Sequence, residues 1–252
     1  MNALAVIKAV FHRTWLSVAR RPVLLLLSFV QPLIWMSFFG FLFHRFPLGQ
    51  LPDDVSYLAF LLPGVCGMTV LVGASQSGIG VIRDVQTGFL ERILSTPANR
   101  VALLLGKISA DVCRLLVQAT LVAALGALLG VRFHVQPGPL LLAVFYLGLF
   151  GAGYCCLSCW IALKTRSQES LASFIHVANL PIFFTSTALV PVKQMPSWLS
   201  NIAAWNPLTL AVEPLREAML VGTATQRLDA LGILALAAMM LFILAIQALK
   251  RA

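Results

Sequence analysis

Long apolar runs without formal charge are the feature that most constrains this chain. Residues 22–44 contain no Lys, Arg, Asp or Glu, and neither do residues 55–82. A helix needs about 20 mostly apolar residues to cross the hydrocarbon core of a bilayer. Both runs are therefore predicted to span a membrane. The whole chain is 60% hydrophobic and only 11% charged, and a soluble domain of this length cannot hide so much apolar surface.

We predict an all-α polytopic membrane protein with six transmembrane helices, and one transmembrane domain that covers residues 1–252. The predicted spans are 22–44, 55–82, 108–130, 138–162, 170–191 and 229–249. Residues 192–222 are interrupted by Pro196, Asn206 and Pro207, which makes a seventh spanning helix unfavourable. Irregular backbone at membrane depth needs cover from protein or water, so we predict an external re-entrant hairpin here. Trp198 and Trp205 would anchor it at the outer interface.

Residues 1–21 come before the first span and carry an apolar stripe at helical spacing. The stripe consists of Leu4, Ile7, Phe11, Trp15 and Val18, and Lys8, Arg13 and Arg20 lie off it. This pattern predicts an amphipathic interfacial helix on the cytoplasmic leaflet. The alternative is a plain cytoplasmic extension of the first span.

The basic residues indicate the orientation of the chain. With the N-terminus inside, twelve of the 18 Lys and Arg residues fall in inner segments and five in outer ones. By the positive-inside rule, both termini are predicted to be cytoplasmic. The net charge of +9 is spread singly between apolar runs, so we expect no nucleic-acid partner.

No catalytic or metal site is predicted. An intramembrane enzyme needs ionisable groups held together inside the bundle, at a cost of about 2.5–3.5 kcal/mol each, and most of the spans carry none. His176 is the only His well inside a span, and a packing role fits it better than catalysis. Cys155, Cys156 and Cys159 read as small buried thiols rather than metal ligands.

One charged group does occur at the start of the third span. Lys107, Asp111 and Arg114 are spaced so that they share one helix face. They are interpreted as a self-paired, snorkelling helix start, with a substrate contact as the alternative.

The chain is not predicted to hydrolyse ATP. Gly106 and Lys107 invite comparison with a phosphate-binding loop, but Val101 stands where the first Gly belongs and Ile108 replaces the Ser or Thr. Energy for active transport would have to come from another polypeptide.

The loop of residues 83–100 has its own amphipathic pattern. Phe89, Leu90, Ile93 and Leu94 form an apolar stripe, and Asp84 can cap a short helix that carries it. Such a helix suits a groove on a partner, although a helix bound to the surface of its own chain explains the stripe equally well.

The loop also carries a family pattern. Its residues are Arg83, Gly88, Glu91, Leu94, Thr96, Pro97 and Arg100. Further pieces are Gln31-Pro32, Leu62-Pro63-Gly64, Leu105-Gly106-Lys107, Asp111, Met195-Pro196, Trp198-Leu199 and Asn206-Pro207-Leu208-Thr209. In this order and spacing, over nearly the whole chain, they resemble the type 2 ABC transporter permeases, including the daunorubicin-type drug-exporter branch. Nodulation-factor and polysaccharide exporters share much of the pattern.

The resemblance implies a permease subunit of an ATP-driven exporter in the bacterial inner membrane. Two P-loop ATPase subunits would bind ATP and magnesium, while this chain binds no cofactor of its own. The loop residues of this pattern, together with Phe89 and Arg92, would form the ATPase-coupling interface. A second permease copy or paralogue would complete the bundle.

An amphipathic or lipid-like substrate is expected, because the spans carry few charges. Phe38, Phe39, Phe183 and Phe184 are candidates for the lining of the route, although lipid-facing packing is an equal alternative. Competing functions are export of a lipid-linked glycan or envelope lipid, a non-transporting membrane scaffold, and a stand-alone channel. A neighbouring reading frame encoding a P-loop ATPase would favour the exporter.

Overall fold

The computed structural model describes residues 3–20, 22–42, 56–95, 99–223 and 227–251, and this part of the chain is helical without any strand. The helices are α1 (Ala3–Ala19), α2 (Pro22–Leu42), α3 (Tyr57–Ser75), α4 (Ser77–Gln86), α5 (Phe89–Leu94), α6 (Arg100–Leu128), α7 (Pro137–Thr165), α8 (Gln168–Phe184), the 3-10 turn η1 (Val192–Gln194), α9 (Ser197–Trp205), α10 (Pro207–Leu220) and α11 (Leu228–Arg251). The prediction of an all-α chain is confirmed for these residues.

Among the described residues, four helical stretches are long and apolar enough to cross a membrane. They are Tyr57–Gln86, Arg100–Leu128, Pro137–Thr165 and Leu228–Lys250. They correspond to the second, third, fourth and sixth predicted spans. Helix α2 contains a shorter apolar stretch, Phe29–Leu42. The six-span count stays a prediction, because it needs α2 and α8 as well.

Helix α8 is shorter than the predicted span 170–191. The helix ends at Phe184, and the hydroxyl groups of the next two residues bind its last carbonyls. Thr185 Oγ1 donates to Pro181 O at 2.7 Å and Ser186 Oγ donates to Phe183 O at 2.6 Å. These bonds satisfy carbonyl groups that a further turn of helix would otherwise use, so the chain turns away.

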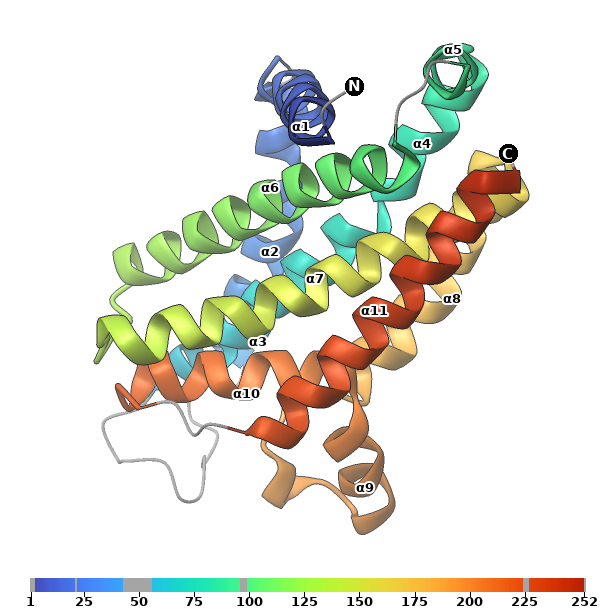
Figure 1. Cartoon of the computed structure of the whole chain (residues 1–252). Coiled ribbons are helices and arrows are strands. Elements are labelled where there is room, and N and C mark those ends of the chain that lie inside the picture. The colour runs from blue at the N-terminus through green and yellow to red at the C-terminus, as the bar shows by residue number, and fades with distance from the viewer. Residues whose placement is uncertain (1–2, 21, 43–55, 96–98, 224–226, 252) are drawn as a thin grey trace.

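Helix α3 forms the centre of the bundle. Almost every side chain from Tyr57 to Leu71 is buried, and α2, α6, α7 and α10 pack around it. Figure 1 shows α5 and both chain ends on one side of the bundle, with α9 on the opposite side. The termini therefore share a side, as the prediction for both termini requires. The assignment of that side to the cytoplasm stays a prediction from the basic residues.

Helix α1 lies against α6 rather than standing apart from the bundle (Figure 1). Its contact residues are Val6, Ile7 and Val10, which pack on Ala102 and Leu103. This face is rotated from the predicted stripe, where Leu4 is 73% exposed. Packing against α6 thus selects the contact face, and the location of α1 at a membrane surface stays a prediction.

The predicted hairpin has two arms of different character. Helix α9 is mostly exposed, whereas α10 is buried along most of its length within the bundle. Asn206 makes the corner between them: its Oδ1 accepts from Leu208 N at 2.9 Å, and its Nδ2 donates to Ile182 O at 2.7 Å. The buried side-chain amide thus starts α10 and ties it to α8.

Between α8 and η1 the chain passes through the bundle without helical structure. Residues 186–189 are buried between α3 and α10. Arg216 of α10 donates to Thr187 O at 2.7 Å and to Phe60 O at 3.3 Å, and pairs with Glu213 at 2.5 Å. Burial lowers the pKa of the Arg216 guanidinium, and the Glu213 carboxylate opposes this shift. The buried guanidinium of Arg216 thus provides a hydrogen-bond donor for the carbonyl group of Thr187, which lies outside the helices.

Candidate functional site

The predicted short helix in the loop after the second span is confirmed as α5. Gly88 separates it from α4 and adopts φ 67° and ψ 6°, the left-handed region that favours glycine. The predicted cap at Asp84 is wrong. Asp84 lies inside α4, its carboxylate is occupied by Arg13, and Gly88 holds the N-cap position of α5.

The apolar stripe of α5 lies against its own chain. Ile93 and Leu94 pack on the small cluster of Val6, Ala102 and Leu103, which joins α1 to α6. Leu90 packs against the main core. The stripe therefore fits the helix bound to its own chain, and a partner groove is not needed to explain it.

The outer surface of the α4–α5 segment is polar. Glu91 and Arg92 are exposed on α5, and Arg83 is exposed on α4. The apolar side of α5 packs on its own chain, so these exposed charged side chains are the part of the segment that a partner can contact. A docking surface at this end would therefore be charged.

Arg13 links α1 to both helices of this segment. Its guanidinium donates to the two carboxylate oxygens of Asp84 at 2.6 and 3.1 Å, and its Cζ lies 3.6 Å from the centre of the Phe89 ring. The residue combines a bidentate ion pair with a cation–π contact. Sequence reasoning missed it, although its position off the apolar stripe of α1 was a usable signal.

A small cavity of about 60 Å³ lies beneath α5. Side chains from α1, α4, α5, α6, α7 and α11 line it, among them Arg13, Leu90, Lys107 and Cys159. Helix α5 therefore lies over an incompletely filled space where side chains of six helices meet.

Arg100 has an internal role in this structure. Its guanidinium donates to Leu249 O at 3.3 Å and to Lys250 O at 2.9 Å, the last carbonyls of α11. A cation at this position stabilises the helix C-terminus. Of the other predicted interface residues, Thr96 and Pro97 lie outside the described residues.

The four phenylalanines predicted for the substrate route form one cluster around Trp35. The Trp35 ring lies 5.0 Å from Phe39, 5.3 Å from Phe183 and 6.3 Å from Phe184, measured between ring centres. Phe38 joins through Phe39 at 5.3 Å. The cluster bridges α2 and α8, which are far apart in sequence. Sequence reasoning missed Trp35, whose i, i+4 spacing to Phe39 was the available signal.

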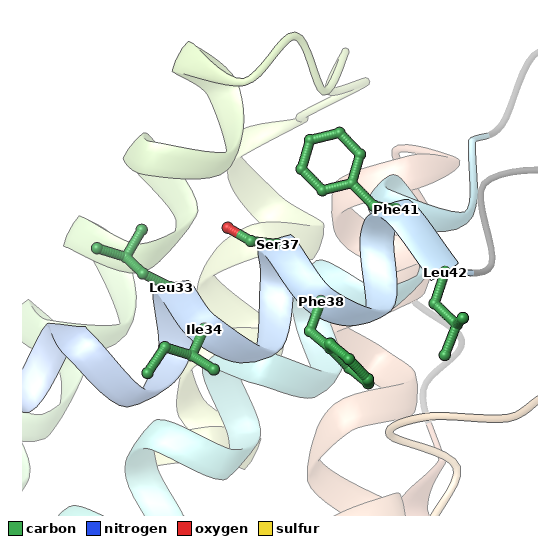
Figure 2. Close-up of a pocket in the computed structure, with 6 residues that line it drawn as sticks. All are labelled: Leu33, Ile34, Ser37, Phe38, Phe41 and Leu42. Carbon is green, nitrogen blue, oxygen red and sulfur yellow. The ribbon is translucent and has the colours of Figure 1, made fainter.

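An open, shallow apolar surface lies along α2 beside this cluster, and all of its lining residues belong to α2. Figure 2 shows its lining of Leu33, Ile34, Ser37, Phe38, Phe41 and Leu42. Phe38 and Phe41 are 59% and 82% exposed, whereas Phe183 is buried. Within the cluster, Phe183 of α8 is buried, while Phe38 of α2 and Phe184 of α8, which is 52% exposed, lie at its open edge.

Residues 5–220 match the family described as ABC-2 type transporter. The chain belongs to this family of ABC transporter permeases. The resemblance read from the loop and its flanking motifs is therefore confirmed. As a member of this family, the chain is a membrane-embedded permease subunit, and the family works with ATPase subunits.

Similar proteins come from several sources. The chain is 34% identical to ycf38 of Cyanophora paradoxa, named as a transport permease, over 81% of this chain and 70% of that protein. It is 28% identical to the daunorubicin resistance ABC transporter permease DrrB1 of Streptomyces coeruleorubidus, over 79% and 69%. It is 25% identical to DrrC of Mycobacterium tuberculosis, named for doxorubicin resistance, over 79% and 71%.

Proposed function

We propose that this permease exports amphipathic or lipid-like compounds, of the drug or antibiotic type, from the cytoplasm of a bacterial cell. The chain would act in the inner membrane with both termini cytoplasmic. Two separate ATPase subunits and a second permease copy would complete the exporter. The names of the relatives, two of which refer to daunorubicin or doxorubicin resistance, support the substrate class.

The observation that carries the proposal is the arrangement of α5. This helix lies at the end of the bundle that also holds both termini (Figure 1), with its apolar side on α1 and α6 and with Glu91 and Arg92 exposed. A short helix held in this way can bind an ATPase through its charged side and pass force to the bundle through its apolar side. ATP binding must then favour one arrangement of the bundle over the other.

The α2–α8 face supports the position of the substrate route. Helix α8 buries only Leu171 and Phe183, and His176 is exposed at the middle of the helix. A polar side chain at membrane depth is costly in lipid, so this surface needs cover from water or from another protein surface. A route between two copies, lined on each by the aromatic cluster, meets that need and suits apolar substrates.

The test uses the charged side of α5 and leaves its packed side intact. Glu91→Ala and Arg92→Glu are each compared with Glu169→Ala, which removes an equally exposed carboxylate from the first turn of α8. Loss of a charge-assisted hydrogen bond costs about 1.5–3 kcal/mol, so ATPase binding should weaken about tenfold or more.

The measurement is co-purification with the ATPase, followed by efflux and substrate-stimulated ATP hydrolysis in proteoliposomes. We expect both α5 variants to insert normally yet to lose coupled efflux, while Glu169→Ala behaves as the wild type. Normal binding and efflux in both α5 variants would refute the assignment of α5 as the coupling helix.

A further inference from the structure

The spanning stretch Tyr57–Gln86 is interrupted inside the bundle. Helix α3 ends at Ser75 and α4 begins at Ser77, with a turn at Gln76 where Ile79 N bonds Gln76 O at 3.1 Å. Such an i to i+3 bond replaces the normal i to i+4 ladder, a common cause of a bend in a long helix. Two helix ends therefore meet at this break: the negative C-terminus of α3 and the positive N-terminus of α4.

Helix α6 places a charge of the matching sign at each of these two ends. Arg114 donates from NH2 to Gly73 O, in the last turn of α3, at 3.2 Å. Asp111 accepts a short hydrogen bond from the hydroxyl group of Ser77, the first residue of α4. A cation at the end of α3 and an anion at the start of α4 are the stabilising arrangement.

Lys107 completes the group. Its Nζ lies 2.8 Å from Asp111 Oδ2 and 3.3 Å from Ser77 Oγ. The side chains of Lys107, Asp111 and Arg114 are 15%, 7% and 16% exposed. The three residues are thus self-paired, as interpreted from the sequence, and their charged groups lie mostly buried beside the α3–α4 break. The Asp111 carboxylate is the one anion of the three, and it pairs with both Lys107 and Arg114.

Helices α7 and α8 bind the same break from the other side. Ser158 of α7 accepts from Gly78 N at 2.9 Å and donates a short bond to Ser75 O. Asn179 of α8 donates from Nδ2 to Ser75 Oγ at 2.9 Å, and Tyr154 OH donates to Asn179 Oδ1 at 2.7 Å. The residue just before the break is therefore bonded directly to α8, the helix that carries Phe183 and Phe184.

We propose that the break at Gln76 is a hinge, held by Asp111, Ser77 and Asn179, that transmits movement of the α4–α5 arm to α8. This inference rests on the proposed function for the origin of the movement. The hinge can work because side-chain hydrogen bonds have replaced backbone ones there, and such bonds exchange partners at less cost than a helical ladder. Asp111 and Ser77 act as positioning residues, since the force arrives through α5 and leaves through α8.

The experiment separates movement of the arm from movement of α8. Spin labels at Ser95 and Leu141 report the position of α5 relative to α7, and labels at Val177 and Leu141 report α8 relative to α7. Leu141 and Val177 are 71% and 74% exposed, so labels fit there. Of the native thiols, Cys113 is replaced by Ala, and the four others are buried. Distances are measured on the complete complex with its ATPase, with and without ATP.

We expect ATP to change both distances in the wild type. In Asp111→Asn the Ser95–Leu141 distance should still respond, while the Val177–Leu141 response is lost and substrate moved per ATP falls about tenfold. Asp111→Glu keeps the negative charge, so it should restore part of the Val177–Leu141 response and part of the substrate moved per ATP. Ser77→Ala should also reduce the Val177–Leu141 response. This variant is used for the test if Asp111→Asn does not insert into the membrane. Thr69→Val is the control, because it removes a buried hydroxyl that bonds within α3, away from the break.

Each other outcome overturns a defined claim. A Val177–Leu141 response of wild-type size in both Asp111→Asn and Ser77→Ala overturns the hinge and leaves the proposed function standing. Failure of the wild-type complex to bind an ATPase, or to move α5 with ATP, overturns the proposed function and the hinge with it. Equal loss of the α8 response in Thr69→Val shows a general packing effect and also overturns the hinge.

Discussion

Arg13 and Asp84 are 71 residues apart in sequence and form a bidentate ion pair that links α1 to α4, the helix that precedes α5. The Arg13 side chain is 44% exposed, so solvent screens the pair and its contribution to stability is at most about 1 kcal/mol. Its geometry matters more than its energy, because the same guanidinium lies over Phe89, the first residue of α5. Arg13 of α1 therefore contacts both sides of the turn at Gly88 between α4 and α5.

We expect Arg13→Ala, Asp84→Ala and the double variant to lower coupled efflux by similar factors. All three remove the ion pair, and Arg13→Ala and the double variant also remove the contact with Phe89, so the double variant should lose no more efflux than Arg13→Ala alone. Efflux in proteoliposomes measures this, and thermal unfolding should shift little in any of them. A double variant whose loss equals the product of the two single losses would show that the residues act separately.

Gly88 should tolerate Asn but not Ala. A Cβ at Gly88 meets nothing within 4 Å, so backbone strain alone decides the outcome. The left-handed conformation costs Ala about 1–2 kcal/mol, while Asn adopts it more readily. Gly88→Ala should therefore reduce efflux without loss of membrane insertion, and Gly88→Asn should stay near the wild-type rate. Equal efflux in both variants would mean that the turn has no part in coupling.

Gly64 and Gly232 should respond to Ala in opposite ways. A Cβ at Gly64 would collide with the backbone oxygen of Ala188, where the buried segment 186–189 crosses α3. Overpacking of this kind costs about 1–3 kcal/mol. Gly232 in α11 has open space, so Ala there should stabilise the protein by about 0.4–1 kcal/mol. Thermal unfolding in detergent should show a lower midpoint for the first variant and an equal or higher one for the second.

Labelling of single cysteines tests the topology. Asn99 caps α6 at the α5 side of the bundle, while Ser200 lies in α9 on the opposite side (Figure 1). A cysteine at Asn99 should react with an impermeant reagent only from the cytoplasm, and one at Ser200 only from outside. Permeabilised cells provide the control for total reactivity. Labelling of Ser200 from the cytoplasm would make the segment after α8 a true span and the even count wrong.

The sequence alone determined the features that depend on local composition. Long apolar runs indicated the four stretches that the structure shows as helices long and apolar enough to cross a membrane, and the motifs from Arg83 to Arg100 indicated the family, because apolar length and motif order do not depend on distant contacts. The stripe Phe89–Leu94 likewise predicted α5, since its spacing is that of a helix.

The tertiary structure decided what each face contacts. The sequence could not distinguish the stripe of α5 from a partner-binding surface, whereas the structure shows that Ile93 and Leu94 pack on α1 and α6. Lys107, Asp111 and Arg114 were readable as a shared face, but their role at the α3–α4 break was not, because Ser77 lies 34 residues before Asp111. The spacing of apolar and charged residues in the sequence specifies which side of a helix is polar and which is apolar. Which neighbour that side meets depends on the packing of segments far apart in the chain, and no local pattern contains that information.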